Sequence, residues 1–204
     1  MARVSAAERR EQLIEAAIAV AVRDGLAATT VRRVAGQADV SLGTVHYCFQ
    51  DKDELLVAAA RALAQPYVGP VGDVVEAGTG GEHRNLEELL RGALRAFWEV
   101  AESSRGRQLL TFELTTWALR EDRPAVAEEM FTQFRATIGQ FIQGVTESAG
   151  ITWTEPRERI ERLVLTITNG VALAWLVDDD REAALDQLDL FAGQLARLAE
   201  PASS

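Results

Sequence analysis

Side chains that can bind phosphates and the edges of nucleobases gather between residues 29 and 52. Hydroxyl and basic groups donate hydrogen bonds to phosphate oxygens, which position a protein on a duplex without reading its sequence. Side chains that enter a groove read the bases directly. The predicted phosphate donors are Thr29, Thr30, Tyr47 and Lys52, while Arg32 and Arg33 could reach phosphates or bases. The predicted groove-facing residues are Leu42, Thr44, His46 and Tyr47, with Ser41 as helix cap and Gly43 allowing close backbone approach.

Two short helices joined by a tight turn are needed to position these side chains. Thr29 and Thr30 indicate the start of one helix that ends near Gln37, and Ser41 indicates the start of another that ends near Cys48. Asp39 is expected to adopt the left-handed conformation in the turn, which Asp tolerates better than most residues. This pattern predicts a helix-turn-helix whose second helix enters a DNA groove. Its small core is expected to consist of Val34, Ala35, Ala38, Val40 and Val45.

Helix signals continue through nearly the whole chain, so the predicted fold class is all-α with about nine helices. A helix-turn-helix domain is expected at 1–50, a connecting helix at 51–65, and an effector-binding and dimerisation domain within 51–204. We find no alternating strand pattern of useful length, and proline and glycine make 66–84 the one predicted extended loop. The predicted helices cover about 6–24, 30–37, 41–48, 51–64, 86–102, 106–120, 124–148, 157–177 and 181–199.

The distribution of charge separates the two ends of the chain. The net charge is −10 over 204 residues, yet residues 1–62 carry eight basic and eight acidic side chains. The acidic excess therefore lies beyond the candidate DNA-binding segment. Because salt screens charges separated by more than about 8–10 Å, distant acids leave the field near Arg32, Arg33 and Lys52 intact. Overall acidity still weakens non-specific DNA binding, which favours a specific regulator.

The run from Thr29 to Leu55 resembles the N-terminal signature of tetracycline-repressor (TetR) type transcriptional regulators. The hydroxyl caps, Gly43-Thr44, Phe49 and Lys52 all fall at the expected spacing, and the resemblance covers about residues 8–60. It implies a homodimer that binds a palindromic double-stranded DNA operator, most simply as a repressor, and is released by a small, largely hydrophobic effector. Three residues depart from the usual pattern, and they affect base reading more than fold: Asp39, Leu42 and Cys48.

Aromatic residues interleaved with small polar ones in the C-terminal half could line an effector cavity, although core packing explains most of them. By resemblance, the predicted ligand-binding residues are Trp98, Phe112, Thr116, Trp117 and Phe134. Glu113 is expected to face solvent. The last two helices carry apolar stripes that could pack inward in a monomer; their breadth and the resemblance favour a dimer interface. The predicted interface residues are Leu163, Ile167, Gly170, Val171, Ala174, Trp175, Leu188, Phe191 and Leu195.

Two histidines and one cysteine make no catalytic set, so we predict neither an enzyme nor a metal or cofactor site. Asp178, Asp179 and Asp180 are interpreted as a helix cap rather than a cation site, and Cys48 as a packing residue rather than a redox sensor. The apolar stretch from Leu163 to Val177 falls short of a membrane span, and no signal peptide is visible. The expected location is the cytoplasm.

The leading hypothesis is a ligand-responsive, DNA-binding homodimer. The alternative is a helical small-molecule-binding protein without DNA-binding activity, a reading motivated by Asp39, Leu42 and the charge of −10. A helical enzyme is a third and weaker alternative, because the chain has no reactive constellation. If residues 1–4 form an arm, Arg3 could enter the minor groove.

Overall fold

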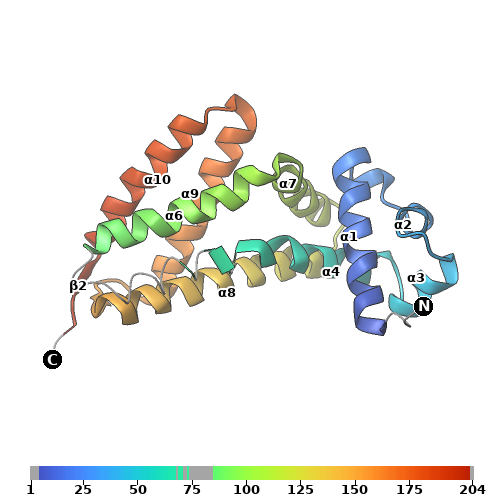
Figure 1. Ribbon diagram of the computed structural model, residues 1–204, viewed down its shortest axis with the longest axis horizontal. Coiled ribbons are helices and arrows are strands. Elements are labelled where there is room, and N and C mark those ends of the chain that lie inside the picture. The colour runs from blue at the N-terminus through green and yellow to red at the C-terminus, as the bar shows by residue number, and fades with distance from the viewer. Residues whose placement is uncertain (1–4, 68, 71–72, 74–84, 203–204) are drawn as a thin grey trace. The chain divides into compact units, whose positions relative to one another are not determined.

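The computed structural model describes residues 5–67, 69–70, 73 and 85–202, and these residues are almost entirely helical (Figure 1). The all-α prediction is confirmed. Nine α-helices have described bounds, and their starts lie within one or two residues of those expected from the caps and breakers. They are α1 Ala6–Asp24, α2 Val31–Gln37, α3 Leu42–Cys48, α4 Lys52–Ala64, α6 Leu86–Ser103, α7 Arg105–Arg120, α8 Pro124–Ala149, α9 Arg157–Asp178 and α10 Arg181–Ala196. Two short 3₁₀ turns, η1 Leu26–Ala28 and η2 Gln65–Tyr67, follow α1 and α4.

Local caps set the beginnings of the N-terminal helices. Ser5 and Glu8 form the predicted capping box of α1: the Ser5 hydroxyl accepts from the Glu8 amide, and the Glu8 carboxylate accepts from the Ser5 amide. These hydrogen bonds lower the pKa of Glu8. At the other end, Gly25 has a φ of 84° and donates its amide to the Ala21 carbonyl, which ends α1.

The chain divides into two compact units, and each contains parts of the sequence that lie far apart. The first unit comprises Met1–Gln65 and Gly106–Thr132, and the second comprises Pro66–Arg105 and Gln133–Ser204. The predicted boundary near residue 50 differs from this division. Helix α4 and most of α7 belong to the first unit, because their side chains bond to α1, to α3 or to each other.

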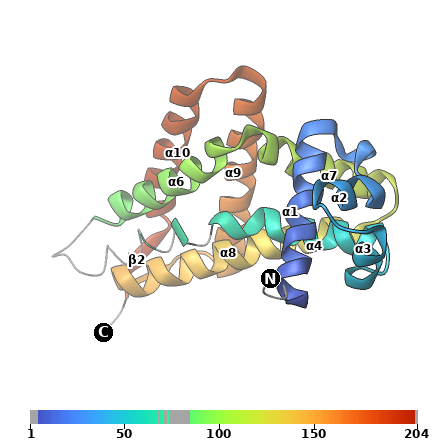
Figure 2. The ribbon, with the colours of Figure 1, turned by 45° about the vertical axis from the view of Figure 1, so that its right-hand side comes forward.

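The core of the first unit lies where α1, α2 and α3 meet (Figure 2). Leu13 and Ala17 of α1 pack there with Phe49 and Leu55. The small core predicted for the helix-turn-helix is confirmed: Val34, Ala35, Ala38 and Val45 are buried, and Val40 packs against them.

The second unit has its own core, in which α6 lies beside α10 and α10 beside α9. Trp98 and Leu90 of α6 are fully buried there together with Ile160 of α9 and Leu188 of α10. A fully buried leucine or isoleucine contributes about 1.5–3 kcal/mol relative to an exposed one, so this core is a large part of the unit's stability.

A short antiparallel ladder, β1 Ile151–Trp153 with β2 Ala199–Pro201, was not predicted. Thr152 pairs with Glu200, and α10 ends at Ala196 instead of near 199. Three residues are too few for an alternating pattern to be visible in the sequence, and the pairing joins segments almost fifty residues apart. Most of the predicted loop at 66–84 and the predicted arm residue Arg3 lie outside the described residues.

Helix α9 is long and apolar enough, by length and composition alone, to cross a membrane. This differs from the prediction that its apolar stretch falls short. A single such helix is weak support for a membrane span, since the core helices of many folded proteins pass the same test. Here Ile160, Val164 and Trp175 of α9 pack into the core of the second unit.

Candidate nucleic-acid interface

The turn between α2 and α3 has the geometry that the sequence predicted. Thr30 caps α2 by accepting a hydrogen bond from the Arg33 amide, and Ser41 caps α3 by accepting one from the Thr44 amide at 3.2 Å. Between the caps, Asp39 adopts the left-handed conformation with a φ of 52°. The Val40 amide then bonds to the Ala35 carbonyl at 3.0 Å, which closes the turn. The two helices are therefore fixed at a short, defined connection.

Helix α3 turns one face to the core and leaves the other free. Val45 is buried, whereas Tyr47 is 82% exposed and Leu42 is 46% exposed. Ser41, Gly43 and His46 are also exposed, and Thr44 is half-buried with its hydroxyl 2.9 Å from that of Ser41. Large exposed aromatic and aliphatic side chains on one helix mark a contact surface.

Gly43 shows that this face meets something outside the chain. A Cβ atom at position 43 would contact only the Ser41 hydroxyl oxygen, at 3.7 Å, an ordinary van der Waals distance. The chain's own packing therefore does not require glycine at this position. A glycine within a helix costs up to about 1 kcal/mol relative to alanine, so the choice is consistent with a bound partner that approaches the backbone closely.

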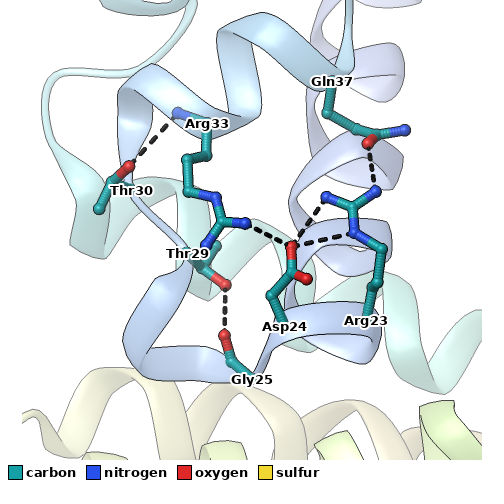
Figure 3. Close-up of polar contacts among 7 residues, drawn as sticks. All are labelled: Arg23, Asp24, Gly25, Thr29, Thr30, Arg33 and Gln37. Carbon is teal, nitrogen blue, oxygen red and sulfur yellow. Dashed lines mark hydrogen bonds and ion pairs between the residues drawn. The ribbon is translucent and has the colours of Figure 1, made fainter.

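Thr29 corrects one prediction. Its side chain is only 1% exposed, and its hydroxyl donates to the Gly25 carbonyl at 3.2 Å (Figure 3). The group that was expected to hold a phosphate is instead part of the turn joining α1 to α2. Thr30, the next residue, is exposed and remains available beyond its capping bond.

The two arginines of α2 are in different electrostatic situations. Arg33 pairs with Asp24 at 2.7 Å, and the same carboxylate accepts from Arg23 at 2.8 Å (Figure 3). The hydrogen bond from Arg23, helped by the charge of Arg33, lowers the pKa of Asp24. Arg32 is exposed, and the structure gives it no such acidic neighbour among the described residues. The positive charge of Arg33 is thus partly neutralised within the unit, whereas that of Arg32 is not.

Lys52 begins α4, directly after the cap Asp51, whose carboxylate accepts from the Glu54 amide at 2.8 Å. The Lys52 ammonium lies 5.7 Å above the centre of the Trp117 ring. Two turns of the chain earlier, Arg10 of α1 donates to the Cys48 carbonyl and to Glu54, and its guanidinium stacks 4.0 Å from the centre of the Phe49 ring. Arg10 therefore joins the end of α3 to the start of α4. The sequence gave no sign of this role, because one arginine on a polar helix face looks like any other.

Comparison with known proteins identifies the group to which this helix-turn-helix belongs. Residues 13–59 match the family described as "Bacterial regulatory proteins, tetR family". The chain is 30% identical over 177 residues to the HTH-type nicotine-responsive transcriptional repressor HdnoR of Paenarthrobacter nicotinovorans, covering 86% of this chain and 88% of that one. The chain belongs to the TetR family.

Solved structures agree with this assignment along the whole chain. The multidrug binding protein EbrR complexed with imidazole is 27% identical, with a TM-score of 0.70 over 96% of this chain and 98% of its own. A transcriptional regulator from Rhodococcus sp. Rha1 is 25% identical, with a TM-score of 0.74 over 95% and 99%. This TetR-family protein is a transcriptional regulator of the ligand-responsive kind, and the alternative of a binding protein that lacks DNA-binding activity is not supported. The relatives and the family are regulators and not enzymes.

The five predicted ligand-binding residues of the TetR-family protein do not fall in one compact unit. Trp98 and Phe134 belong to the second unit, and Phe112, Thr116 and Trp117 to the first. Trp98 is fully buried and meets Trp175 edge to face, with ring centres 5.3 Å apart. Phe134 lies 5.7 Å from Tyr67, which in turn stacks on Phe97 at 4.9 Å. The Thr116 hydroxyl is spent on the Phe112 carbonyl at 2.9 Å.

Glu113 has a structural role that the sequence did not reveal. It was expected to face solvent, yet its carboxylate accepts a hydrogen bond from the Leu26 amide at 3.0 Å. That amide is at the start of η1, immediately after the end of α1. A long-range contact between residues 87 positions apart has no local signature.

The predicted dimer residues divide by exposure. Leu163, Gly170 and Ala174 of α9 are exposed, and Ile167 and Val171 are half-buried. By contrast, the side chains of Leu188 and Leu195 are fully buried, and those of Trp175 and Phe191 nearly so, because they fill the core of the second unit. These four are therefore not available to a partner in this structure. The sequence missed three large exposed apolar residues nearby: Leu173, Val177 and Leu190.

The acidic turn before α10 is a cap, as predicted. Asp180 accepts from the Ala183 amide at 2.9 Å, and Asp178 accepts from the Asp180 amide at 3.0 Å. Asp179, with a φ of 60°, pairs with Arg105, which also donates to the Trp175 and Leu176 carbonyls at the end of α9. Within the part of the chain that the structure describes, no cluster of potential metal ligands occurs. Cys48 is half-buried against the core of the first unit.

Proposed function

We propose that this regulator binds a palindromic operator as a homodimeric repressor, with α3 of each subunit in a major groove, and that a small, largely hydrophobic effector releases it. The observation that carries the DNA-binding half is the free face of α3 around Gly43, whose missing Cβ the fold does not require. A two-fold dimer places two such helices about 34–36 Å apart, which matches one turn of duplex DNA. A protein with this role would act in the cytoplasm.

In this proposal the exposed side chains have different tasks. Leu42, Thr44 and His46 face the bases, and Tyr47 and Lys52 bind phosphates on either side of the groove. Thr30 and Arg32 add contacts from α2. Phosphate contacts release counterions, so each one lost reduces the slope of log K against log salt by about 0.9.

Fluorescence anisotropy with genomic fragments selected for binding tests this assignment. We expect Tyr47→Ala and Lys52→Ala to weaken binding in 50–200 mM salt, by amounts that shrink as salt rises, since each removes a phosphate contact. Leu119→Ala, an exposed change on α7, serves as the matched control and keeps the wild-type affinity. Wild-type affinity and salt slope in both α3–α4 variants would contradict the assignment, and no salt-sensitive binding to any fragment would end the proposal.

The dimer is supported by the apolar face that α9 leaves uncovered. Leu163, Leu173 and Val177 are exposed on this helix, and Val177 is 82% exposed. Gly170 lies on the same face, and a Cβ there would meet nothing within 4 Å, so a second helix has room to approach closely. We propose that α9 and α10 of two subunits form a four-helix interface. Sedimentation of Leu173→Glu should show monomers where the wild type and Leu119→Glu sediment as dimers. A monomeric wild type at working concentration would refute it.

The effector half is supported by Trp98. Its indole N–H is buried and has no hydrogen-bond partner among the described residues. An unsatisfied buried donor costs about 1–3 kcal/mol, so a bound molecule that supplies an acceptor gains what the free protein lacks. Aromatic neighbours such as Trp175 in the same core suit a flat ring. We therefore propose a heteroaromatic effector with an unprotonated ring nitrogen or a carbonyl, a class consistent with the nicotine-responsive relative and the imidazole-bound neighbour.

Matched probes separate this contact from general apolar binding. Quinoline and naphthalene have the same shape, and only quinoline carries an acceptor. We expect quinoline to move the indole ¹H–¹⁵N signal of Trp98, and Trp98→Phe to remove its advantage over naphthalene. Trp153→Phe is the control, because the Trp153 N–H already donates to Thr146 at 2.8 Å. An unmoved Trp98 signal with quinoline, nicotine and imidazole alike, for instance because its N–H already points at the ring face of Trp175, would refute the effector class.

To act as a switch, the effector must bind the DNA-incompetent state more tightly than the competent one, whatever its absolute affinity. Helix α4 is the proposed carrier of the change, since Lys52 lies at its first residue.

A further inference from the structure

Three consecutive residues at the start of α4 are each held by a different element of the first unit. The Lys52 ammonium lies over the ring of Trp117 in α7. The Asp53 carboxylate pairs with Arg123, in the turn between α7 and α8. The Glu54 carboxylate accepts from Arg10 of α1 at 2.7 Å and from the Gln50 amide at 2.8 Å. This first turn of α4, residues 52–54, is therefore clamped from three directions, while farther along Arg61 pairs with Glu129 of α8 at 2.8 Å.

The clamp occupies the face of Trp117 that a flat ligand would need. The ammonium lies 5.7 Å from the ring centre, within the distance of about 6 Å at which a cation is attracted to an aromatic face. Trp117 and Lys52 lie in the same compact unit, whereas Trp98 and Phe134 lie in the other. The sequence placed Trp117 among the effector-binding residues, but its observed contact is with a predicted DNA-binding residue.

The contact leaves the ammonium able to bind a phosphate. A lysine ammonium has three N–H donors, and attraction to a ring face is electrostatic and does not use them all. Lys52 is half-buried, so its flexible stem is already partly restricted before any DNA arrives. Holding a rotamer-rich side chain in place before binding removes part of the entropy cost of about 0.5–1.5 kcal/mol that immobilising it would otherwise add.

We propose that Trp117 is a positioning residue for operator binding: its ring holds the Lys52 ammonium at the start of α4 in the place where a backbone phosphate is bound. The proposal rests on the proposed function, in which Lys52 contacts a phosphate. It makes residues 117–123 the part of the C-terminal sequence that sets operator affinity directly. Any effector-driven shift of α7 relative to α4 within the first unit would then weaken the Lys52 contact.

A double-mutant cycle on operator affinity tests the proposal. A cation–π contact at a partly exposed site is worth about 0.5–1 kcal/mol, so Trp117→Leu should weaken operator binding about two- to fivefold. Trp117→Phe keeps a ring face and should retain most of the affinity. In a Lys52→Ala background, Trp117→Leu should have no further effect, because the residue that it positions is gone. Leu119→Ala, exposed on the same helix, is the matched control.

A spectroscopic measurement reports the contact without DNA. The ring current of Trp117 should shift the Lys52 Hε signals upfield in the free protein, and Trp117→Leu should return them to ordinary lysine values. Circular dichroism shows whether each variant is folded, and Trp117→Phe and the Lys52 signals keep the test decisive if Trp117→Leu does not fold.

Additive effects in the cycle, unchanged or tighter binding by folded Trp117→Leu, or unshifted Lys52 signals in the wild type would overturn the positioning role. Those results are distinguishable from failure of the proposed function, in which the wild-type protein itself binds no operator.

Discussion

The left-handed residue at the centre of the helix-turn-helix allows a sharp test of how this turn is stabilised. Asp39 has a φ of 52° and an exposed side chain, so substitutions there change backbone strain with little effect on packing. A left-handed residue with a Cβ costs roughly 1–2 kcal/mol, and short polar side chains reduce that cost, whereas β-branched ones increase it. We therefore expect Asp39→Val to lower the free energy of unfolding by about 1–2 kcal/mol.

The other substitutions at this position should follow the same order. Asp39→Asn should be close to wild type, because Asn tolerates the left-handed region equally well. Asp39→Gly removes the steric strain but adds freedom to the unfolded chain, so its net effect should lie within about 0.5 kcal/mol of zero. Asp39→Ala should fall between Asn and Val.

Urea unfolding followed by circular dichroism measures these differences, and amide exchange in α2 and α3 shows whether the loss is local. Asp39→Asn is the control that removes the charge and keeps the conformation. If Val and Asn at position 39 had equal unfolding free energies, backbone strain would not be what residue 39 contributes, and the reasoning would fail.

Three further predictions follow from other contacts of the first unit. The Gln50 amide and Arg10 hold the pKa of Glu54 below its usual value, so its contribution to stability is present above about pH 4.5 and is lost as the pH falls through the lowered pKa; urea unfolding of Glu54→Gln between pH 7 and pH 3 should show a shallower acid-side loss than wild type, and an unchanged slope would contradict this. A Cβ at Gly106 would lie 2.5 Å from Val22 Cγ1, so Gly106→Ala should destabilise the protein by about 1–2 kcal/mol from overpacking but should be neutral or stabilising in a Val22→Ala background, a sign change that thermal unfolding can detect and whose absence would count against the clash. Because Asp24 already neutralises part of the Arg33 charge, Arg32→Ala should weaken operator binding in low salt more than Arg33→Ala does, and equal losses in anisotropy titrations would show that the ion pair opens on DNA.

Contacts between distant segments were outside the reach of sequence reasoning. Arg10 bonding to Glu54, Glu113 to Leu26 and Lys52 lying over Trp117 each join residues at least 44 positions apart. Their residue types are ordinary for helix surfaces, so nothing in the local pattern distinguishes them from solvated side chains. Burial posed a similar problem: Thr29 and Thr30 are equally good caps by type, yet only the fold buries the Thr29 hydroxyl against Gly25.

By itself the sequence determined the local features of this protein: the helices and their caps at Ser5, Thr30, Ser41 and Asp180, the left-handed turn at Asp39, and the helix-turn-helix that these features build. Caps and turns depend on hydrogen bonds between residues two to four apart, so the residue types suffice. Only the tertiary structure decided that α4 and most of α7 share a unit with the helix-turn-helix, and that Leu188 and Leu195 face inward while Leu173 and Val177 face outward. An apolar stripe shows that a helix has a face to bury, but the partner that covers it is chosen by the packing of the whole chain.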